Sequence, residues 1–320
     1  MQWLRFLLFP FAICYDGITR LRNLAFDSGI LKQKQYDIPV IAVGNLSTGG
    51  TGKTPMVEYL IREFNDKRIA VLSRGYGRNT SGYIQLNTES IASEVGDEPL
   101  QIKIKFPEII VAVCENRVDG IDQLLNDHEL DVILLDDAYQ HRYVKASQYI
   151  LLTDFSKPYF NDYLLPVGNL REARIGAHRA SHIVITKCPE NIDQEIKNNY
   201  LRAIRPLKHQ KVYFSTITYD QKVVGSNKSI ALQNLPENFA VVTGIANPST
   251  FIEFLSDYGV FSHLEYDDHH QFTDVEINTI RNSNMVITTE KDFVRLLPYQ
   301  LDNCYFLPIK SSFIDEPIQL

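Results

Sequence analysis

The chain has 320 residues, of which 44% are hydrophobic and 22% are charged, and its net charge is −7. These values are typical of a globular protein of about two domains, and they exclude a disordered or fibrous chain. The acidic balance argues against a general nucleic-acid-binding protein, and four widely spaced cysteines argue against a disulfide framework or a zinc cluster.

The N-terminal segment, about residues 1–36, differs in charge from the rest of the chain. It begins with a mostly apolar run over residues 3–15 and carries five basic but only two acidic side chains. A bilayer-spanning helix needs about 20 apolar residues, so this run is too short to cross a membrane. Two interpretations remain open: a helix in the core of the first domain, or a segment in a membrane interface with its basic residues at anionic headgroups.

Apolar runs alternate with helical stretches from residue 38 onwards. The expected strands cover residues 38–43, 68–73, 107–113, 131–136, 149–153 and 182–186, and the expected helices cover residues 55–64 and 117–126. Continuous apolar runs with helices between them predict a parallel sheet that is covered on both faces. We expect this α/β domain to occupy about residues 1–210.

A smaller α/β domain is expected over residues 211–320. Its strands cover residues 239–243, 261–266 and 285–288, and its helices cover residues 248–258 and 274–282. Two β-rich segments, about residues 211–219 and 304–310, flank this unit. We expect them to pair as a two-stranded link between the domains, and the alternative is that each joins its nearer sheet.

A glycine-rich loop, GNLSTGGTGKTP over residues 44–55, lies between an expected strand and an expected helix. That context is typical of a phosphate-binding loop, in which backbone N–H groups and a helix N-terminus surround phosphate oxygens. Ser47 stands where the strict pattern has glycine. The candidate nucleotide-binding residues are Ser47, Thr48, Gly49, Gly50, Thr51, Gly52, Lys53 and Thr54. The loop predicts a P-loop NTPase type of fold for the first domain.

Divalent metal binding is predicted at the same site. Lys53 is expected to reach the β- and γ-phosphates, and Thr54 to hold Mg²⁺. The apolar residues 132–135 of the expected strand are followed by Asp136 and Asp137, and an acid in this position coordinates Mg²⁺ directly or through water. The metal-site candidates are therefore Thr54, Asp136 and Asp137.

Two short patterns indicate the class of nucleotide-dependent protein. A guanine-specific GTPase has Asp at the end of an Asn/Thr-Lys-x-Asp motif, but Pro189 stands there in Thr-Lys-Cys-Pro. This favours ATP. Thr48 replaces the signature lysine of the partition and carrier ATPases. An enzyme that phosphorylates a bound acceptor is therefore favoured over a nucleotide switch.

Several polar residues follow the expected strands and are candidates for contact with the acceptor. Arg74 and Arg78 lie in SRGYGR and suit an anionic acceptor, and the alternative is an ordinary polar turn. Asp97 in GDEP is either a helix cap or a base for an acceptor hydroxyl. Arg117 opens a helix and is either a solvated helix-surface residue or a contact for the acceptor. Arg171 is either a surface residue or a positive charge at the phosphoryl group.

The segment DDHHQF, residues 267–272, has three possible roles. It could bind a metal, although adjacent histidines rarely face one ion. It could form a solvated turn, or it could bring a histidine from the second domain to the active site. The segment TTEKD, residues 288–292, is explained by a strand end and a helix cap.

Together these motifs resemble the tetraacyldisaccharide 4'-kinase family of the lipid A pathway in Gram-negative bacteria. The matching pieces, in the family's order, are GNLSTGGTGKTP, SRGYGR, GDEP, ENR, LDDAYQH, LPVGNLRE, DDHHQF and TTEKD, and they span residues 44–292. Ala138-Tyr139 stands where Gly-Phe is common in the family. The resemblance implies Mg²⁺- and ATP-dependent phosphorylation of the 4'-hydroxyl of a tetraacyl glucosamine disaccharide 1-phosphate, which gives lipid IVA in lipopolysaccharide synthesis.

The resemblance also implies roles for individual residues and a location. Asp97 is the expected base and His269 its assistant. Lys53 and Arg171, which the sequence itself indicates, are the other catalytic candidates. The expected substrate-binding residues are Arg74, Tyr76, Arg78, Asn116, Arg117, Gln140 and His141. The implied partners are the lipid substrate and the cytoplasmic face of the bacterial inner membrane, with neither nucleic acid nor an obligatory protein partner.

The alternative function is a P-loop ATPase coupled to cofactor synthesis or metal-centre delivery. A non-enzymatic nucleotide switch ranks third.

Overall fold

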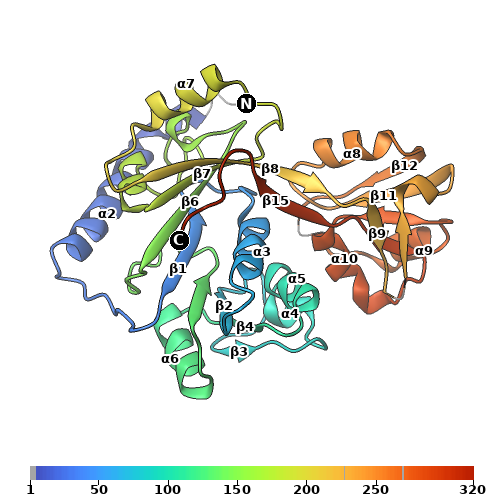
Figure 1. Cartoon of the computed structure of the whole chain (residues 1–320), viewed down its shortest axis with the longest axis horizontal. Helices are drawn as coiled ribbons and strands as arrows, with labels where there is room; N and C mark the ends of the chain where they lie inside the picture. The colour runs from blue at the N-terminus through green and yellow to red at the C-terminus, as the bar shows by residue number, and fades with distance from the viewer. Residues whose placement is uncertain (1–4, 227, 269) are drawn as a thin grey trace.

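The chain forms two β-sheets with helices packed against them, as a computed structural model of residues 5–226, 228–268 and 270–320 shows (Figure 1). The larger sheet has the strand order β15-β8-β7-β6-β1-β5-β2-β4-β3. Its strands are β1 (Val40–Asn45), β2 (Ile69–Ser73), β3 (Ile84–Gln85), β4 (Ile110–Val113), β5 (Val132–Leu135), β6 (Gln148–Asp154), β7 (His182–Thr186), β8 (Lys211–Tyr219) and β15 (Ile309–Phe313). Neighbouring strands from β4 to β8 in this order are parallel, whereas β3 and β15 are antiparallel to their neighbours.

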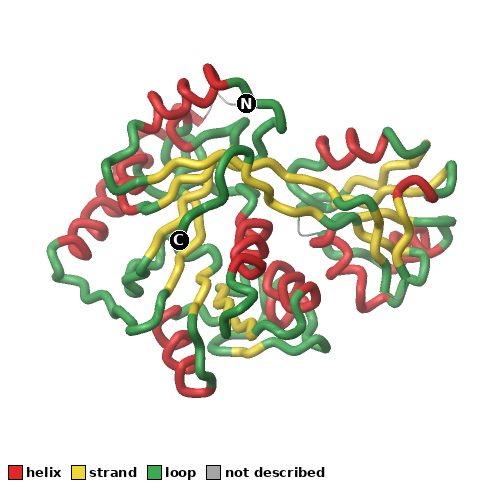
Figure 2. Tube along the Cα trace, viewed as in Figure 1, coloured by secondary structure: helices red, strands yellow, loops and turns green. Residues whose placement is uncertain are grey.

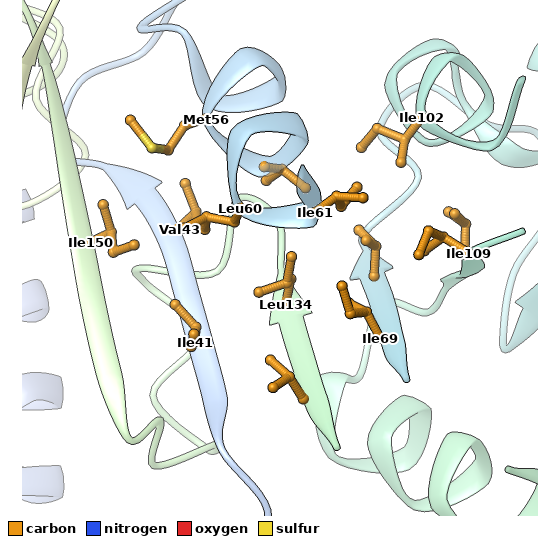
Figure 3. Close-up of a cluster of buried hydrophobic side chains, with 14 of the residues drawn as sticks. Ile41, Val43, Met56, Leu60, Ile61, Ile69, Ile102, Ile109, Leu134 and Ile150 are labelled. Atoms are coloured by element: carbon orange, nitrogen blue, oxygen red, sulfur yellow. The ribbon is translucent and has the colours of Figure 1, made fainter. Parts of the chain in front are cut away.

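The helices of this part cover both faces of the sheet, as predicted. They are α2 (Phe9–Asp27), α3 (Lys53–Glu63), α4 (Ala92–Val95), α5 (Asp97–Lys105), α6 (Arg117–Asp127) and α7 (Gln194–Ile204), with the short 3-10 helices η1 (Phe6–Leu8), η2 (Tyr159–Asn161) and η3 (Arg174–Arg179). Alternate residues of β1 face opposite sides. Ile41 and Val43 pack with α3 (Figure 3). Val40 and Ala42 lie on the opposite face, in the cluster that includes Ile121 and Leu124 of α6.

The smaller sheet has the strand order β10-β9-β14-β13-β11-β12. Its strands are β9 (Lys222–Val224), β10 (Ser229–Ala231), β11 (Asn238–Thr243), β12 (Val260–Glu265), β13 (Val286–Thr288) and β14 (Cys304–Phe306). Its helices are α8 (Ser249–Ser256), α9 (Asp274–Arg281) and α10 (Glu290–Leu296), with η4 (Leu232–Asn234) and η5 (Leu297–Tyr299). Figure 2 shows this second α/β unit beside the first.

A pair of antiparallel strands joins the two units, but its second strand differs from the expected one. β8 pairs with β15 from Ser215↔Phe313 to Tyr219↔Ile309. Cys304–Phe306, which we expected in this link, is instead strand β14 of the smaller sheet, where it pairs with β13. Leu307 and Pro308 separate β14 from β15. The Pro308 carbonyl accepts a hydrogen bond from the backbone N–H of Asp220. The domain boundary near residue 210 stays a prediction.

The N-terminal helix α2 lies along the outside of the larger unit (Figure 1). It is longer than the apolar run suggested. Ala12 and Phe26 are buried against the protein. Five large apolar side chains on its other faces are between 60% and 69% exposed: Phe11, Ile13, Ile18, Leu21 and Leu24. Within the described ranges, no helix combines the length and the hydropathy needed to cross a bilayer.

Candidate active site

The glycine-rich loop connects β1 to α3, where the sequence pattern predicted it. Gly49 and Gly52 have φ angles of +104° and +81°, which other residues rarely adopt. Polar contacts hold both ends of the loop. Asn45 Nδ2 donates to Thr51 Oγ1 at 2.8 Å, and the backbone N–H of Thr48 donates to the Asn169 carbonyl at 2.8 Å. All eight candidate nucleotide-binding residues belong to this loop or to the first turn of α3. The middle of the loop, residues 48–50, is exposed.

Three charged side chains meet next to the loop. Arg171 Nη1 lies 3.1 Å from Asp137 Oδ1, and Lys53 Nζ lies 3.8 Å from the same atom. Burial would raise the pKa of Asp137, but the positive charges of Lys53 and Arg171 outweigh it and hold this pKa below its usual value. Asp137 is thus an ionised carboxylate that orients two cationic side chains.

Asp136 is completely buried at the end of β5. Ser73 Oγ donates to Asp136 Oδ2 at 3.2 Å, whereas Oδ1 has no hydrogen-bond partner among the described residues. Burial, together with the negative charges of Glu98 and Asp137, raises the pKa of Asp136 to about 7. A buried carboxylate oxygen without a donor, near other acids, fits a site for a divalent cation. Thr54, the third metal-site candidate, is half-buried in the first turn of α3.

Arg117 is buried, which corrects the interpretation of a solvated helix surface. Its guanidinium donates to the carbonyls of Cys114 at 3.1 Å and of Asp136 at 3.3 Å. Burial lowers the pKa of Arg117 to about 10. The backbone N–H of Arg117 donates to His141 Nε2 at 3.3 Å, and burial followed by the charge of Arg117 lowers the pKa of His141 to about 4. The hydrogen bonds from Arg117 hold the backbone of Asp136 and Asp137 in place.

Two more substrate-binding candidates have structural contacts of their own. Asn116 is the N-cap of α6, because its side chain accepts a hydrogen bond from the N–H of Val118 at 3.1 Å. Gln140 Nε2 donates to the carbonyl of Asn45 at 2.8 Å and to Glu172 Oε1 at 3.1 Å. Their contact with substrate stays a prediction.

The loop after β2 carries three of the substrate-binding candidates, two with exposed side chains and one with a buried side chain. Arg74 is exposed and Tyr76 is 72% exposed. Arg78 points inward, with a side chain 2% exposed, and forms an ion pair with Glu115 at 2.5 Å. Arg78 also donates to the Gly82 carbonyl at 2.7 Å, so it braces the loop. Arg74 and Tyr76 are the side chains of this loop that are open to an acceptor.

Asp97 is the first residue of α5, and Gly96 rather than Asp97 is the N-cap. The Asp97 carboxylate accepts a hydrogen bond from Arg295 Nε of α10 at 2.7 Å. Our sequence reasoning missed this contact, because Arg295 lies beyond TTEKD and in the other α/β unit. His269, the expected assistant of Asp97, lies outside the described residues.

The segments around residues 270 and 290 have defined local roles. Thr289 is the N-cap of α10 and accepts from the N–H of Asp292, which confirms the capping interpretation. His270 Nε2 lies 3.0 Å from Glu276 Oε2. Among the described residues, no group of three or more His, Cys, Asp or Glu side chains is arranged to hold a metal ion.

Comparison with known proteins identifies the family. The family model described as "Tetraacyldisaccharide-1-P 4'-kinase" matches residues 4–319. The tetraacyldisaccharide 4'-kinase of Flavobacterium johnsoniae is 48% identical over 322 residues, covering 98% of this chain and 94% of the relative. The corresponding protein of Cytophaga hutchinsonii is 37% identical and covers 100% of this chain and 95% of its own.

A solved structure agrees with these sequence matches. The crystal structure of LpxK from Aquifex aeolicus, in complex with ATP, superimposes with a TM-score of 0.79 and is 29% identical. The match covers 97% of this chain and 95% of the other. None of these comparisons supports the alternative ATPase function. The chain therefore belongs to the tetraacyldisaccharide-1-P 4'-kinase family, and it is an ATP-dependent kinase of lipid A biosynthesis.

Proposed function

We propose that Asp97 removes the proton from the 4'-hydroxyl of the lipid disaccharide while Lys53 and Arg171 neutralise charge on the phosphoryl group in transfer. The observation that carries the phosphoryl-transfer site is the meeting of Lys53, Arg171 and Asp137 within 3.8 Å beside the glycine-rich loop. Fixed positive charges at a phosphoryl group are the main catalytic contribution that a protein makes to this type of reaction.

Asp97 suits the role of a base by its position as well as by its type. It begins α5, and the neighbouring Glu98 is close enough to Asp136 for its charge to raise the pKa of Asp136. This influence of Glu98 supports a position of the N-terminal end of α5 beside the phosphate site. The hydrogen bond from Arg295 orients the Asp97 carboxylate, and His269 is proposed to assist it.

We assign the metal site to Mg²⁺ held by Asp136, Asp137 and Thr54, which supplies charge neutralisation at the phosphates when it is bound. The unpartnered oxygen of buried Asp136 supports this assignment. Mg²⁺ commonly uses one or two carboxylates and takes its remaining ligands from phosphates and water. Arg74 and Tyr76 then bind the acceptor from the exposed loop after β2.

The exposed apolar face of α2 supports attachment to a lipid surface. Leu21, Ile18 and Leu24 present side chains more than 60% exposed on one helix, which a protein rarely leaves in water without function. We assign this surface to the cytoplasmic leaflet of the inner membrane, where ATP is present and basic residues meet anionic headgroups.

The proposal is tested with Asp97→Asn, which keeps the shape of the side chain but not its basicity. Phosphoryl transfer to the lipid disaccharide should fall at least about 100-fold, within the range for general base catalysis. The KM for ATP should change little. Turnover close to that of the parent enzyme would show that Asp97 is not the base.

A further inference from the structure

The N-terminal helix contacts the segment that carries Arg171. Tyr15 Oη donates to the carbonyl of Arg171 at 2.7 Å, and Asn23 Nδ2 donates to Glu172 Oε2 at 3.1 Å. Tyr15 and Asn23 are eight residues apart on α2, so they share one face of the helix. This is also the face of the two buried residues of α2, Ala12 and Phe26. The same face thus makes both apolar and polar contacts with the protein.

The segment held by α2 leads directly to the phosphate site. The backbone N–H of Arg171 donates to the Leu46 carbonyl at 2.7 Å, at the start of the glycine-rich loop. The guanidinium of the same residue lies 3.1 Å from Asp137 Oδ1. The position of the Arg171 backbone therefore determines where the glycine-rich loop begins in space and how closely the Arg171 guanidinium approaches Asp137.

Glu172 extends this connection into the protein. It is buried, and it accepts hydrogen bonds from Arg179 at 2.7 Å and from Gln140 at 3.1 Å, in addition to the bond from Asn23. Gln140 in turn donates to the carbonyl of Asn45, the last residue of β1. A displacement of α2 would therefore remove donors from a buried carboxylate and from the Arg171 carbonyl, and unpaired buried groups are costly.

Tyr15 is suited to remain a donor over the working pH range. Burial, followed by the negative charge of Glu172, raises the pKa of Tyr15 above its ordinary value. Its hydroxyl group therefore stays protonated and continues to hold the Arg171 carbonyl. On the side of the same helix away from Tyr15 and Asn23, Leu21 and Leu24 remain exposed.

We propose that Tyr15 and Asn23 are positioning residues for Arg171, so that α2 couples the lipid-facing surface to the phosphoryl-transfer site. This inference rests on the role of Arg171 proposed above. It gives α2 a second task, since one face contacts lipid and the opposite face holds the catalytic segment. Loss of the Tyr15 contact should then slow the chemical step of an enzyme that still binds lipid and ATP.

The test uses Tyr15→Phe, measured in mixed micelles of the lipid disaccharide and a non-ionic detergent. In the full-length enzyme, kcat should fall about threefold to tenfold, the size expected for one lost hydrogen bond, with an unchanged KM for ATP. Binding to anionic vesicles should not change, because the apolar face is intact. The matched control is Tyr149→Phe, which removes a hydroxyl group that donates to the Val144 carbonyl at 3.3 Å, near the start of β6; its kcat should equal that of the parent.

A double-mutant cycle with Arg171→Ala separates positioning from general structural damage. If Tyr15 acts through Arg171, adding Tyr15→Phe to Arg171→Ala should cause no further loss of kcat. A normal kcat for Tyr15→Phe, or losses that multiply in the double variant, would overturn the inference while leaving Arg171 catalytic. A normal kcat for Arg171→Ala alone would instead overturn the proposed role of Arg171.

Discussion

Arg295 donates a hydrogen bond from Nε to Asp97 Oδ2 at 2.7 Å, across 198 residues of sequence and between the two α/β units. Arg295 is itself held by Asp292 at 2.9 Å and by the Gly244 carbonyl at 2.9 Å. Its side chain is 7% exposed, and that of Asp97 is 16% exposed. The orientation of the proposed base is therefore determined partly by the smaller unit.

Replacement of Arg295 should impair the chemical step more than ATP binding. In Arg295→Gln we expect kcat to fall about tenfold or more, because a charged hydrogen bond to Asp97 is lost, while the KM for ATP changes less than twofold. Steady-state kinetics with the lipid acceptor measures both values. Arg281→Gln is the control, since Arg281 is an exposed residue of α9 that donates to the Tyr299 carbonyl at 3.1 Å. Equal kcat values for both variants would contradict a role for Arg295 at Asp97.

Substitutions in the phosphate loop should reduce activity more than the substitution of Arg295. Lys53→Ala and Thr54→Ala should each lower phosphoryl transfer by at least about 100-fold, because each removes a group that stabilises charge at the phosphates. Purified variants are compared at saturating ATP and lipid. Circular dichroism checks that both variants are folded. A rate near that of the parent in either variant would rule out the assignment of that residue.

Asp97 and His269 are predicted to act as one unit. Asp97→Ala, His269→Ala and the double variant should then lose similar activity, because effects within a catalytic unit are strongly non-additive. Isothermal titration with a non-hydrolysable ATP analogue should show little change in ATP affinity. A double variant whose loss equals the product of the single losses would indicate independent roles, and His269 would then be assigned to lipid binding or to structure.

The buried carboxyl group of Glu290 should make the free energy of unfolding depend on pH. It is buried where α10 meets α3 and α5, with Lys105 Nζ at 2.6 Å from both Glu290 and Glu58, and with Gln101 donating to both carboxylates. Arg62 also pairs with Glu58 at 3.2 Å. Burial, followed by the charge of Glu58, raises the pKa of Glu290 to about 7.

A raised carboxyl pKa means that the folded protein binds a proton more tightly than the unfolded chain does. The contribution of Glu290 to stability is therefore full below its unfolded pKa of about 4.3 and is lost as the pH rises towards 7. Urea unfolding of the parent and of Glu290→Gln at pH 5, 6, 7 and 8 tests this. The free energy of unfolding should decline more steeply with pH in the parent. Parallel profiles for the two proteins would show that Glu290 ionises normally.

The exposed face of α2 should determine membrane binding. Replacing Ile18 and Leu21 together by Asn should lower partition into anionic vesicles by about tenfold or more, because each large apolar side chain contributes roughly 1.5–3 kcal/mol when buried. The KM for lipid should rise more than the KM for ATP. Val275→Asn is the control, since Val275 is an equally exposed apolar residue, but on α9. Unchanged partition of the folded double variant would refute the anchoring role.

Much of the central sheet could be predicted because its strands are buried on both faces. β1, β5 and β7 appear as continuous apolar runs, and their bounds agree with the expected ones within two residues. Amphipathic elements were harder to predict. α7 gave no clear signal, and the length of α2 was underestimated because polar residues such as Asp16 and Asn23 end or interrupt the apolar run in the sequence. The partner of β8 was misplaced because adjacent β-rich segments, β14 and β15, belong to different sheets.

The site was predictable where its residues are adjacent in sequence. The glycine-rich loop and the acids after β5 are contiguous motifs, so their grouping follows from parallel-strand topology. Contacts between distant segments could not be inferred. The sequence does not indicate that the side chains of Arg78 and Arg117 are buried. It also does not indicate the contacts of Arg295 with Asp97 and of Tyr15 with Arg171.

Transfer of labelled phosphate from γ-labelled ATP to tetraacyl disaccharide 1-phosphate tests the central claim most directly. With the purified enzyme, Mg²⁺ and the lipid in mixed micelles, thin-layer chromatography should show one new labelled lipid, and its phosphate should be on the 4'-position by NMR. The Lys53→Ala variant should give no such product. Release of labelled inorganic phosphate at the same rate with or without the lipid, and no labelled lipid, would contradict the account.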